Sequence, residues 1–335
     1  MRLQLQEYTM CPQTIVFAPP STSIPSSPST ASKTRNVPAK KLLFDRVKQE
    51  QFQLHETRKK LYLQLQKLLG LPIVALFTSF RYPVMLEDGD ANMLEAILQE
   101  SDLSSGLCLV VSSPGGDGLA AERIINLCRS YSGTRKFTAL VPAKAKSAAT
   151  MVCLGAEKII MGMTSELGAI DPQLLGGAKR YSVYRIVESY KKLFGEAVKT
   201  KGNMPPYIQQ LDHYDPKDIA EYESALETST DIAIKALKSG MLSGVPEKKI
   251  ERQIDAFLRP KAVKTHGRPI YADDAMKCGL TIDKRGPTDT MWPVVYELFF
   301  RLDNYVSTRG VAKCIESKDY SYIATAPMED ENNDT

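Results

Sequence analysis

Short apolar runs alternate with helix-like segments between residues 71 and 162, and this alternation restricts the chain to few folds. The apolar runs at 71–80, 106–114, 136–142 and 158–162 have the length and composition of buried strands. The segments at 89–100 and 119–131, and the one that starts at Ser147, are typical of helices. Because the connections are short, we expect stacked βαβ units. The sequence therefore predicts an α/β fold with a largely parallel sheet.

The chain divides into four parts by composition. Residues 1–40 form a tail that is rich in Ser, Thr and Pro, with no acidic residue from position 12 to 40, and we expect this tail to be disordered. Residues 41–70 have apolar residues at helical spacing and predict a long amphipathic helix that ends at Gly70. Residues 71–285 form the compact domain, in which helices dominate beyond residue 180. Residues 286–335 predict a closing helix and an acidic tail.

Charge and cysteine content exclude several classes of protein. The net charge of +4 is small and the basic residues are spread along the chain, so we expect no nucleic-acid partner. No apolar run is long enough to span a bilayer and the N-terminus lacks a secretory signal, which favours the cytoplasm. Six scattered cysteines without a CxxC pair indicate buried thiols. No His/Cys/Asp cluster has metal spacing, so we expect no metal and no cofactor.

Two loops follow successive predicted strands, where open α/β sheets place their sites. The first is "SSPGGDG", Ser112 to Gly118, in which paired glycines leave backbone N–H groups accessible in front of a helix. The second is "AKSAAT", in which Ser147 starts a helix and the N–H of Ala148 lies next to the oxygen of any carbonyl group that Ser147 would attack. Either loop alone is typical of a turn or a helix cap. Their order along the chain indicates a nucleophile with an oxyanion hole.

Four motifs carry a resemblance to a known family. The segments "SSPGGDGLAAERI", "AKSAATMVCLGAEKIIM", "ELGAIDPQ" and "THGRPIYADDAMKCGL" resemble the Clp-protease/crotonase superfamily. Within it they are most similar to the serine dehydrogenase proteinases, relatives of the signal peptide peptidase A proteases. The resemblance runs from about residue 71 to 283. It implies a crotonase-type ββα spiral and ATP-independent serine proteolysis, despite the family's name.

The resemblance also implies roles for individual residues. Ser147 matches the family nucleophile, and Gly116 with the backbone of Ala148 matches the oxyanion hole. Asp171 lies where the Clp peptidase subunit has its catalytic histidine, and His266 lies next to the position of that subunit's aspartate. The resemblance therefore implies that the two partners are exchanged in chain order, with His266 as the base and Asp171 as the group that orients it.

Other assignments stay open from the sequence. A Ser–Lys dyad, as in signal peptide peptidase A, would draw its base from Lys179, Lys191, Lys192 or Lys199. Relatives tend to have Asp where this chain has Gly267, so one carboxylate is unaccounted for and a catalytically silent scaffold remains an alternative. A crotonase-like acyl-CoA enzyme is the third function class.

Partners follow from the same resemblance and from the amphipathic segments. We expect peptide or protein substrates and a homo-oligomer. The apolar segments "MWPVVYELFF" and 41–70 offer surfaces for a second subunit. Packing of the 41–70 segment on protein is favoured over peripheral association with a membrane, which also stays open.

Overall fold

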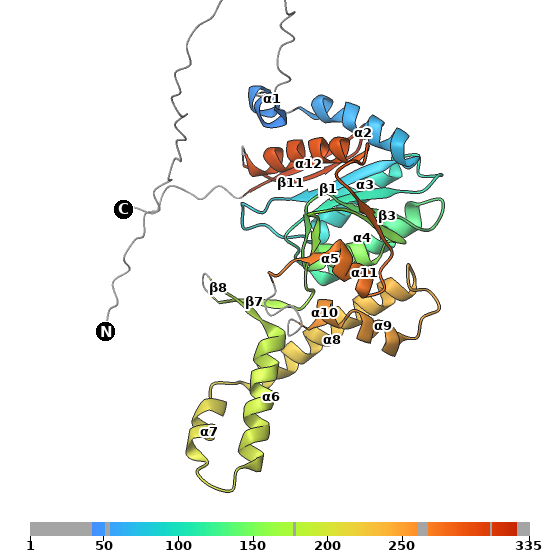
Figure 1. The fold of residues 1–335 in the computed structure, drawn as a ribbon. Coiled ribbons are helices and arrows are strands. Elements are labelled where there is room, and N and C mark those ends of the chain that lie inside the picture. The colour runs from blue at the N-terminus through green and yellow to red at the C-terminus, as the bar shows by residue number, and fades with distance from the viewer. Residues whose placement is uncertain (1–41, 51–53, 177–178, 260–266, 309, 327–335) are drawn as a thin grey trace, which may run out of the picture. The chain divides into compact units, whose positions relative to one another are not determined.

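The computed structural model describes residues 42–50, 54–176, 179–259, 267–308 and 310–326 (Figure 1). The tail expected over 1–40, Cys11, His266 and the acidic end lie outside these residues. The helices are α1 (Leu43–Gln49), α2 (His55–Leu69), α3 (Asp88–Gln99), α4 (Gly118–Tyr131), α5 (Ala148–Leu154), α6 (Val183–Lys199), α7 (Pro205–Leu211), α8 (Pro216–Lys238), α9 (Glu247–Gln253), α10 (Asp255–Leu258), α11 (Ala272–Lys277) and α12 (Trp292–Ser307). The strands are β1 (Ile73–Thr78), β2 (Cys108–Ser112), β3 (Thr138–Val141), β4 (Lys144–Ala145), β5 (Lys158–Gly162), β6 (Glu166–Leu167), β7 (Gln173–Gly176), β8 (Lys179–Ser182), β9 (Ile270–Tyr271), β10 (Ile282–Arg285), β11 (Val311–Glu316) and β12 (Ser321–Thr325).

A seven-stranded sheet forms the centre of the fold, in the order β10-β5-β3-β2-β1-β11-β12. The five strands from β10 to β1 are parallel to their neighbours, whereas β11 pairs antiparallel with β1 and with β12. The predicted α/β fold with a largely parallel sheet is therefore confirmed. The four apolar runs of the sequence became β1, β2, β3 and β5, because strands covered on both faces are apolar throughout.

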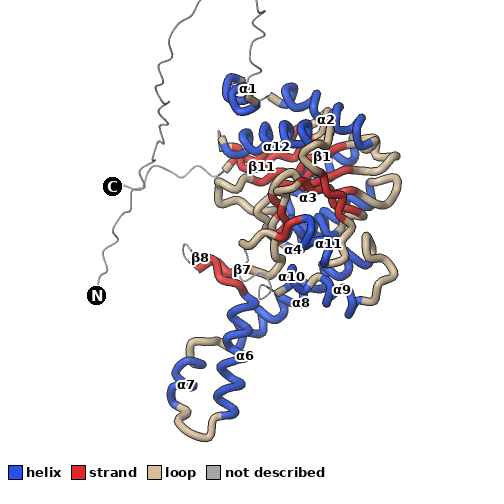
Figure 2. The backbone as a smooth tube through the Cα atoms, viewed as in Figure 1, coloured by secondary structure: helices blue, strands red, loops and turns tan. Residues whose placement is uncertain are grey.

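Helices cover both faces of this sheet (Figures 1 and 2). Along β1, Val74 and Leu76 belong to a core shared with α3, α4 and α5, whereas Ile73 and Phe77 belong to a second core shared with α2 and α12. This alternation follows from the two-residue period of a strand. The result is a three-layer arrangement in which the loops after β2 and β3 lie beside α4 and α5.

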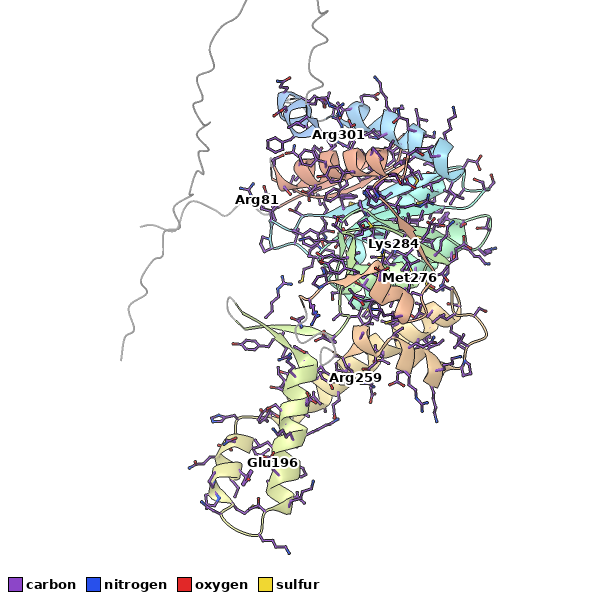
Figure 3. The ribbon with its side chains drawn as sticks, viewed as in Figure 1. Arg81, Glu196, Arg259, Met276, Lys284 and Arg301 are labelled. Carbon is purple, nitrogen blue, oxygen red and sulfur yellow. The ribbon has the colours of Figure 1, made fainter. Side chains whose placement is uncertain are left out.

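The N-terminal segment and the C-terminal helix pack against each other inside the chain. The long helix expected over 41–70 is divided into α1 and α2, with Glu50 and Leu54 outside the helices. Leu61 and Leu65 of α2 share a core with Leu298 of α12. Arg301 of α12, which Figure 3 labels, binds Glu50 beyond α1 at 3.1 Å. The apolar faces expected to bind a second subunit are therefore occupied in part within the chain.

Strands β11 and β12 were not expected from the sequence, which predicted only a helix and a tail beyond residue 286. Strand β11 is buried along its whole length, although it contains Lys313 and Glu316. The Nε atom of Arg58 on α2 donates to Glu316 at 2.8 Å, and Lys313 binds Asp90 on α3 at 3.1 Å. These pairs fix the end of the chain against α2 and α3.

Two smaller β-structures lie beside the central sheet. Strands β4, β6 and β9 form a three-stranded sheet, and β7 with β8 forms an antiparallel hairpin that leads into α6. The described cysteines (Cys108, Cys128, Cys153, Cys278 and Cys314) are free and buried, as expected. No described helix is both long enough and apolar enough to cross a membrane.

Candidate active site

The loop after β2 runs beside the turn that carries Ser147. The N–H of Ser113 donates to Lys144 at 3.2 Å, and the N–H of Lys146 donates back to Ser113 at 3.0 Å. On the other side of the loop, the N–H of Leu86 donates to Gly115 at 2.8 Å. The two loops that the sequence singled out are therefore joined by backbone hydrogen bonds, and their relative position is fixed.

The paired glycines are required by this close approach. Gly115 has a φ of 97°, and a Cβ atom there would lie 2.6 Å from the Cβ of Ser147. A Cβ atom on Gly116 would lie 2.1 Å from the carbonyl oxygen of Leu86. Both distances are far below van der Waals contact, so a side chain at Gly115 would push the loop away from the Ser147 turn, and one at Gly116 would push it away from Leu86.

Ser147 occupies a backbone conformation that is unusual for a residue with a side chain. Its φ is 49° and its ψ is −122°, and apart from Arg135 it is the only non-glycine residue with positive φ in the described chain. It precedes α5, yet its hydroxyl makes no capping hydrogen bond. A strained residue of this kind persists only where the surrounding structure holds it, which is common in catalytic sites. The structure thus disfavours the interpretation of Ser147 as a simple helix cap.

Neighbouring interactions explain how this turn is held. Buried Thr150 on α5 donates through its hydroxyl to the carbonyl of Ala145 at 2.7 Å. The same hydroxyl accepts from the N–H of Gly168 at 3.0 Å. Thr150 therefore ties the Ser147 turn both to β4, which precedes it, and to the segment that follows β6.

Two backbone N–H groups beside Ser147 have no acceptor among the described residues. Both backbone groups next to the N–H of Gly116 are bonded to Leu86: the carbonyl of Gly115 accepts from its N–H, and the N–H of Asp117 donates to its carbonyl. The N–H of Gly116 itself has no such bond. The N–H of Ala148 is the first in helix α5, and the first N–H groups of a helix have no carbonyl acceptor within that helix. Amides of this kind can bind an oxygen that gains negative charge during a reaction.

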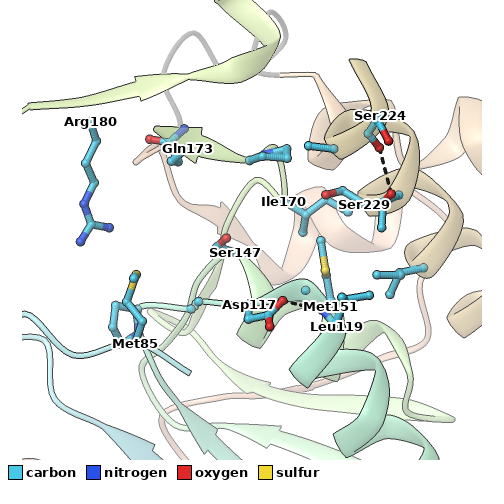
Figure 4. Close-up of a pocket in the computed structure, with 18 of the residues that line it drawn as sticks. Met85, Asp117, Leu119, Ser147, Met151, Ile170, Gln173, Arg180, Ser224 and Ser229 are labelled. Atoms are coloured by element: carbon cyan, nitrogen blue, oxygen red, sulfur yellow. Dashed lines mark hydrogen bonds between the residues drawn. The ribbon is translucent and has the colours of Figure 1, made fainter. Parts of the chain in front are cut away.

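Ser147 opens into a cleft of about 530 Å³ (Figure 4). The glycine loop, the residues that follow β6, the β7–β8 hairpin and helix α8 form its walls. The lining residues include Met85, Gly115, Gly116, Asp117, Leu119, Ser147, Met151, Ile170, Pro172, Gln173, Arg180, Glu221, Ser224, Thr228 and Ile232. The far wall on α8 and the cation Arg180 were not expected from the sequence, since neither lies in a recognisable motif.

Asp171 is buried directly behind this cleft. Its neighbours Ile170 and Pro172 line the cleft, whereas its own side chain is only 1% exposed. Its carboxylate accepts from the hydroxyl of Ser182 at 2.6 Å and from the amide of Gln173 at 3.3 Å. A buried carboxylate with hydrogen-bond donors can orient and stabilise a neighbouring cation.

The small sheet brings three sequence-predicted segments to one end. Ala145 of β4 pairs with Leu167 of β6, which pairs in turn with Ile270 of β9. Because β4 and β6 are parallel, Ser147 and Asp171 follow these strands at the same end. Because β9 is antiparallel to β6, the chain enters β9 at that end too. The segment before Ile270 therefore leads into the sheet beside the Ser147 turn.

The candidate lysines for a Ser–Lys dyad whose side chains the structure describes lie outside the cleft. Lys191, Lys192 and Lys199 are exposed on α6 and do not line the cleft. The ammonium of Lys191 pairs with Glu223 on α8 at 2.6 Å. The side chain of Lys179 lies outside the described part of the chain. These positions weaken the dyad for three of its four candidates.

Lys146, next to Ser147, is also directed away from the cleft. Its ammonium lies 3.1 Å from Glu166 and donates to the carbonyl of Leu167 at 3.2 Å. Burial lowers the pKa of Lys146 below its usual value, and the Glu166 carboxylate opposes this shift. The ion pair holds the amine at β6, and Lys146 is not among the residues that line the cleft. No three described His, Cys, Asp or Glu side chains are placed to hold a metal ion.

Comparison with known proteins agrees with this geometry. The family described as ClpP-like SDH-type serine proteinase matches residues 62–317, which include both loops, the small sheet and β11. The chain is also similar to two uncharacterized proteins of Methanocaldococcus jannaschii. One is 26% identical over 73% of this chain and 72% of its own length. The other is 29% identical over 36% of this chain, and the match spans only 37% of that relative.

Proposed function

This chain belongs to the ClpP-like SDH-type serine proteinases, and on that premise we propose that it cleaves peptide bonds with Ser147 as the nucleophile. The observation that carries the proposal is the conformation of Ser147. Its positive-φ turn faces a cleft, its hydroxyl is not used as a cap, and two amides beside it, on Gly116 and Ala148, have no acceptor in the described part of the chain. A helix cap would require none of these features.

The proposed reaction uses these groups in two steps. The oxygen of Ser147 attacks the substrate carbonyl carbon while its proton passes to the base, and the carbonyl oxygen becomes an oxyanion that the N–H groups of Gly116 and Ala148 bind. The C–N bond then breaks, the base returns its proton to the leaving amine, and an acyl ester remains on Ser147. Water hydrolyses this ester by the same route.

His266 is the base in this proposal, and Asp171 is the residue that orients it. The pairing of β9 with β6 supports the assignment, because His266 precedes Ile270 by four residues and Asp171 follows Leu167 by four. The exposed positions of Lys191, Lys192 and Lys199 support it as well.

Labelling with a fluorophosphonate probe tests the nucleophile. We expect the wild type to gain one probe, located at Ser147 by peptide mass spectrometry, and Ser147→Ala to gain none. The matched control is Ser224→Ala, which removes another serine hydroxyl that lines the same cleft. Labelling that persists in Ser147→Ala contradicts the proposal. A wild type that resists the probe and cleaves no peptide indicates a silent scaffold.

A further inference from the structure

Arg180 projects into the cleft from strand β8. It is exposed, it lines the cleft, and no hydrogen bond or ion pair holds its guanidinium among the described residues. Side chains two apart on a strand share a face, so Arg180 lies on the same face as Ser182, whose hydroxyl binds Asp171. The hydrogen bond at Ser182 therefore fixes the side of the hairpin that faces the site.

Arg180 carries the only positive charge among the described residues that line the cleft. The two negative charges there belong to Asp117 and Glu221. Asp117 caps α4 by accepting from the N–H of Leu119 at 2.9 Å, and Glu221 lies on the opposite wall, on α8. Neither forms an ion pair with Arg180. The cation is therefore left free for a ligand although two carboxylates share its cleft.

The position of Arg180 relative to Ser147 gives the cleft two chemically different ends. In Figure 4 the guanidinium lies on one side of Ser147, near Met85, whereas Leu119, Met151 and Ile170 lie toward the other side. A substrate bound across Ser147 would contact the cation on one side of its scissile bond and apolar side chains on the other.

We propose that Arg180 selects substrates that carry a carboxylate on its side of the scissile bond, either an Asp or Glu side chain or the C-terminal carboxylate of a peptide. A guanidinium presents two parallel N–H groups that match the two oxygens of a carboxylate, and it keeps its charge at every pH in use. This inference rests on the proposed function, since it names the substrates of the same site.

Matched peptides test the inference by hydrolysis. Glu and Gln have nearly the same shape, so peptides that differ by this replacement on the Arg180 side isolate the charge. We expect wild type to prefer Glu by about tenfold in kcat/KM, as for a charge-assisted contact in a partly solvated cleft. Arg180→Gln should remove the preference and Arg180→Glu should transfer it to Lys. The control Lys248→Glu makes the same charge change on exposed α9, outside the cleft, and should leave the preference unchanged.

Binding measurements separate this inference from the peptidase reaction. The same peptides, fluorescently labelled, are titrated into Ser147→Ala, in which catalysis is absent by design. We expect the Glu peptide to bind about tenfold more tightly than the Gln peptide, and Arg180→Gln in that background to abolish the difference. Peptides with free and amidated C-termini distinguish a terminal carboxylate from a side chain.

Equal binding of the Glu and Gln peptides together with equal binding of the free and amidated termini overturns the inference, whether or not the fluorophosphonate labels Ser147. A preference that survives Arg180→Gln overturns it as well. Conversely, a charge preference in binding without any labelling retains the carboxylate subsite and refutes only the proposed nucleophile.

Discussion

The backbone conformation of Ser147 predicts an unusual order of stability for two substitutions. At φ 49° and ψ −122° a residue with a Cβ atom is strained by about 1–3 kcal/mol. Ser147→Ala keeps the Cβ and the strain, whereas Ser147→Gly removes both and loses about 0.5–1 kcal/mol through the greater freedom of glycine in the unfolded chain. We therefore expect the glycine variant to be more stable than the alanine variant by about 1 kcal/mol.

Ser224 provides the matched comparison, because it lies exposed inside the regular helix α8. Glycine in a helix interior is less stable than alanine by about 1 kcal/mol, so the order of the two variants should be reversed there. Urea denaturation measures the free energy of unfolding of Ser147→Ala, Ser147→Gly, Ser224→Ala and Ser224→Gly. The alanine and glycine variants at each position should differ in melting temperature by about 2 °C. If glycine is the less stable residue at 147 as well, Ser147 is unstrained, and its backbone conformation no longer supports a role as nucleophile.

Three further predictions concern the base, the buried thiols and assembly. With His266 as the base, the rate of peptide cleavage should rise with pH through a midpoint of ~7. The His266→Ala variant should lose most of this rate without a change in melting temperature. A rate that rises only at alkaline pH and that His266→Ala does not change points to a lysine base instead. Burial raises the pKa of the Cys108 and Cys128 thiols from 9.0 to about 12, so the folded protein keeps protons that the unfolded chain releases. The free energy of unfolding should then fall as pH rises from 9 toward 12, by up to about 1.4 kcal/mol per pH unit for each thiol. Cys128→Ala should make this fall with pH less steep, and an unchanged pH dependence in that variant contradicts the prediction. Light scattering should give a homo-oligomer, to which the exposed apolar side chains of Phe194, Val198 and Ile208 on α6 and α7 would contribute, and a monomer at micromolar concentration would refute it.

The central strands could be predicted because burial and sequence agree there. Strands β1, β2, β3 and β5 are apolar runs covered on both faces, and the turns between them carry glycine, proline or serine. The short strands β4, β6 and β9 have two residues each, which is too short for any periodic pattern. Their pairing is a long-range property of the fold, although it brings the segments around Ser147 and Asp171 together.

The candidate site was predictable where backbone geometry demands particular residues. Gly115 and Gly116 cannot be replaced without a clash, and Ser147 directly precedes the apolar helix α5, so these positions leave a recognisable pattern. Arg180 leaves none. A single arginine in a polar segment resembles any exposed cation, and only the packing of the β7–β8 hairpin over the cleft distinguishes it.

Strand β11 shows why the extent of the folded unit could not be predicted. Its sequence "VAKCIE" contains two charges, and charges ordinarily exclude a strand from a core. Each charge is tolerated because another element supplies its partner: Arg58 of α2 for Glu316 and Asp90 of α3 for Lys313. Removing one partner from a buried pair costs about 3–5 kcal/mol, a large part of the stability of a typical domain. Helix α2 and strand β11 are therefore interdependent, and the part of the chain that folds together extends on both sides of the candidate-site loops, from α2 through β11.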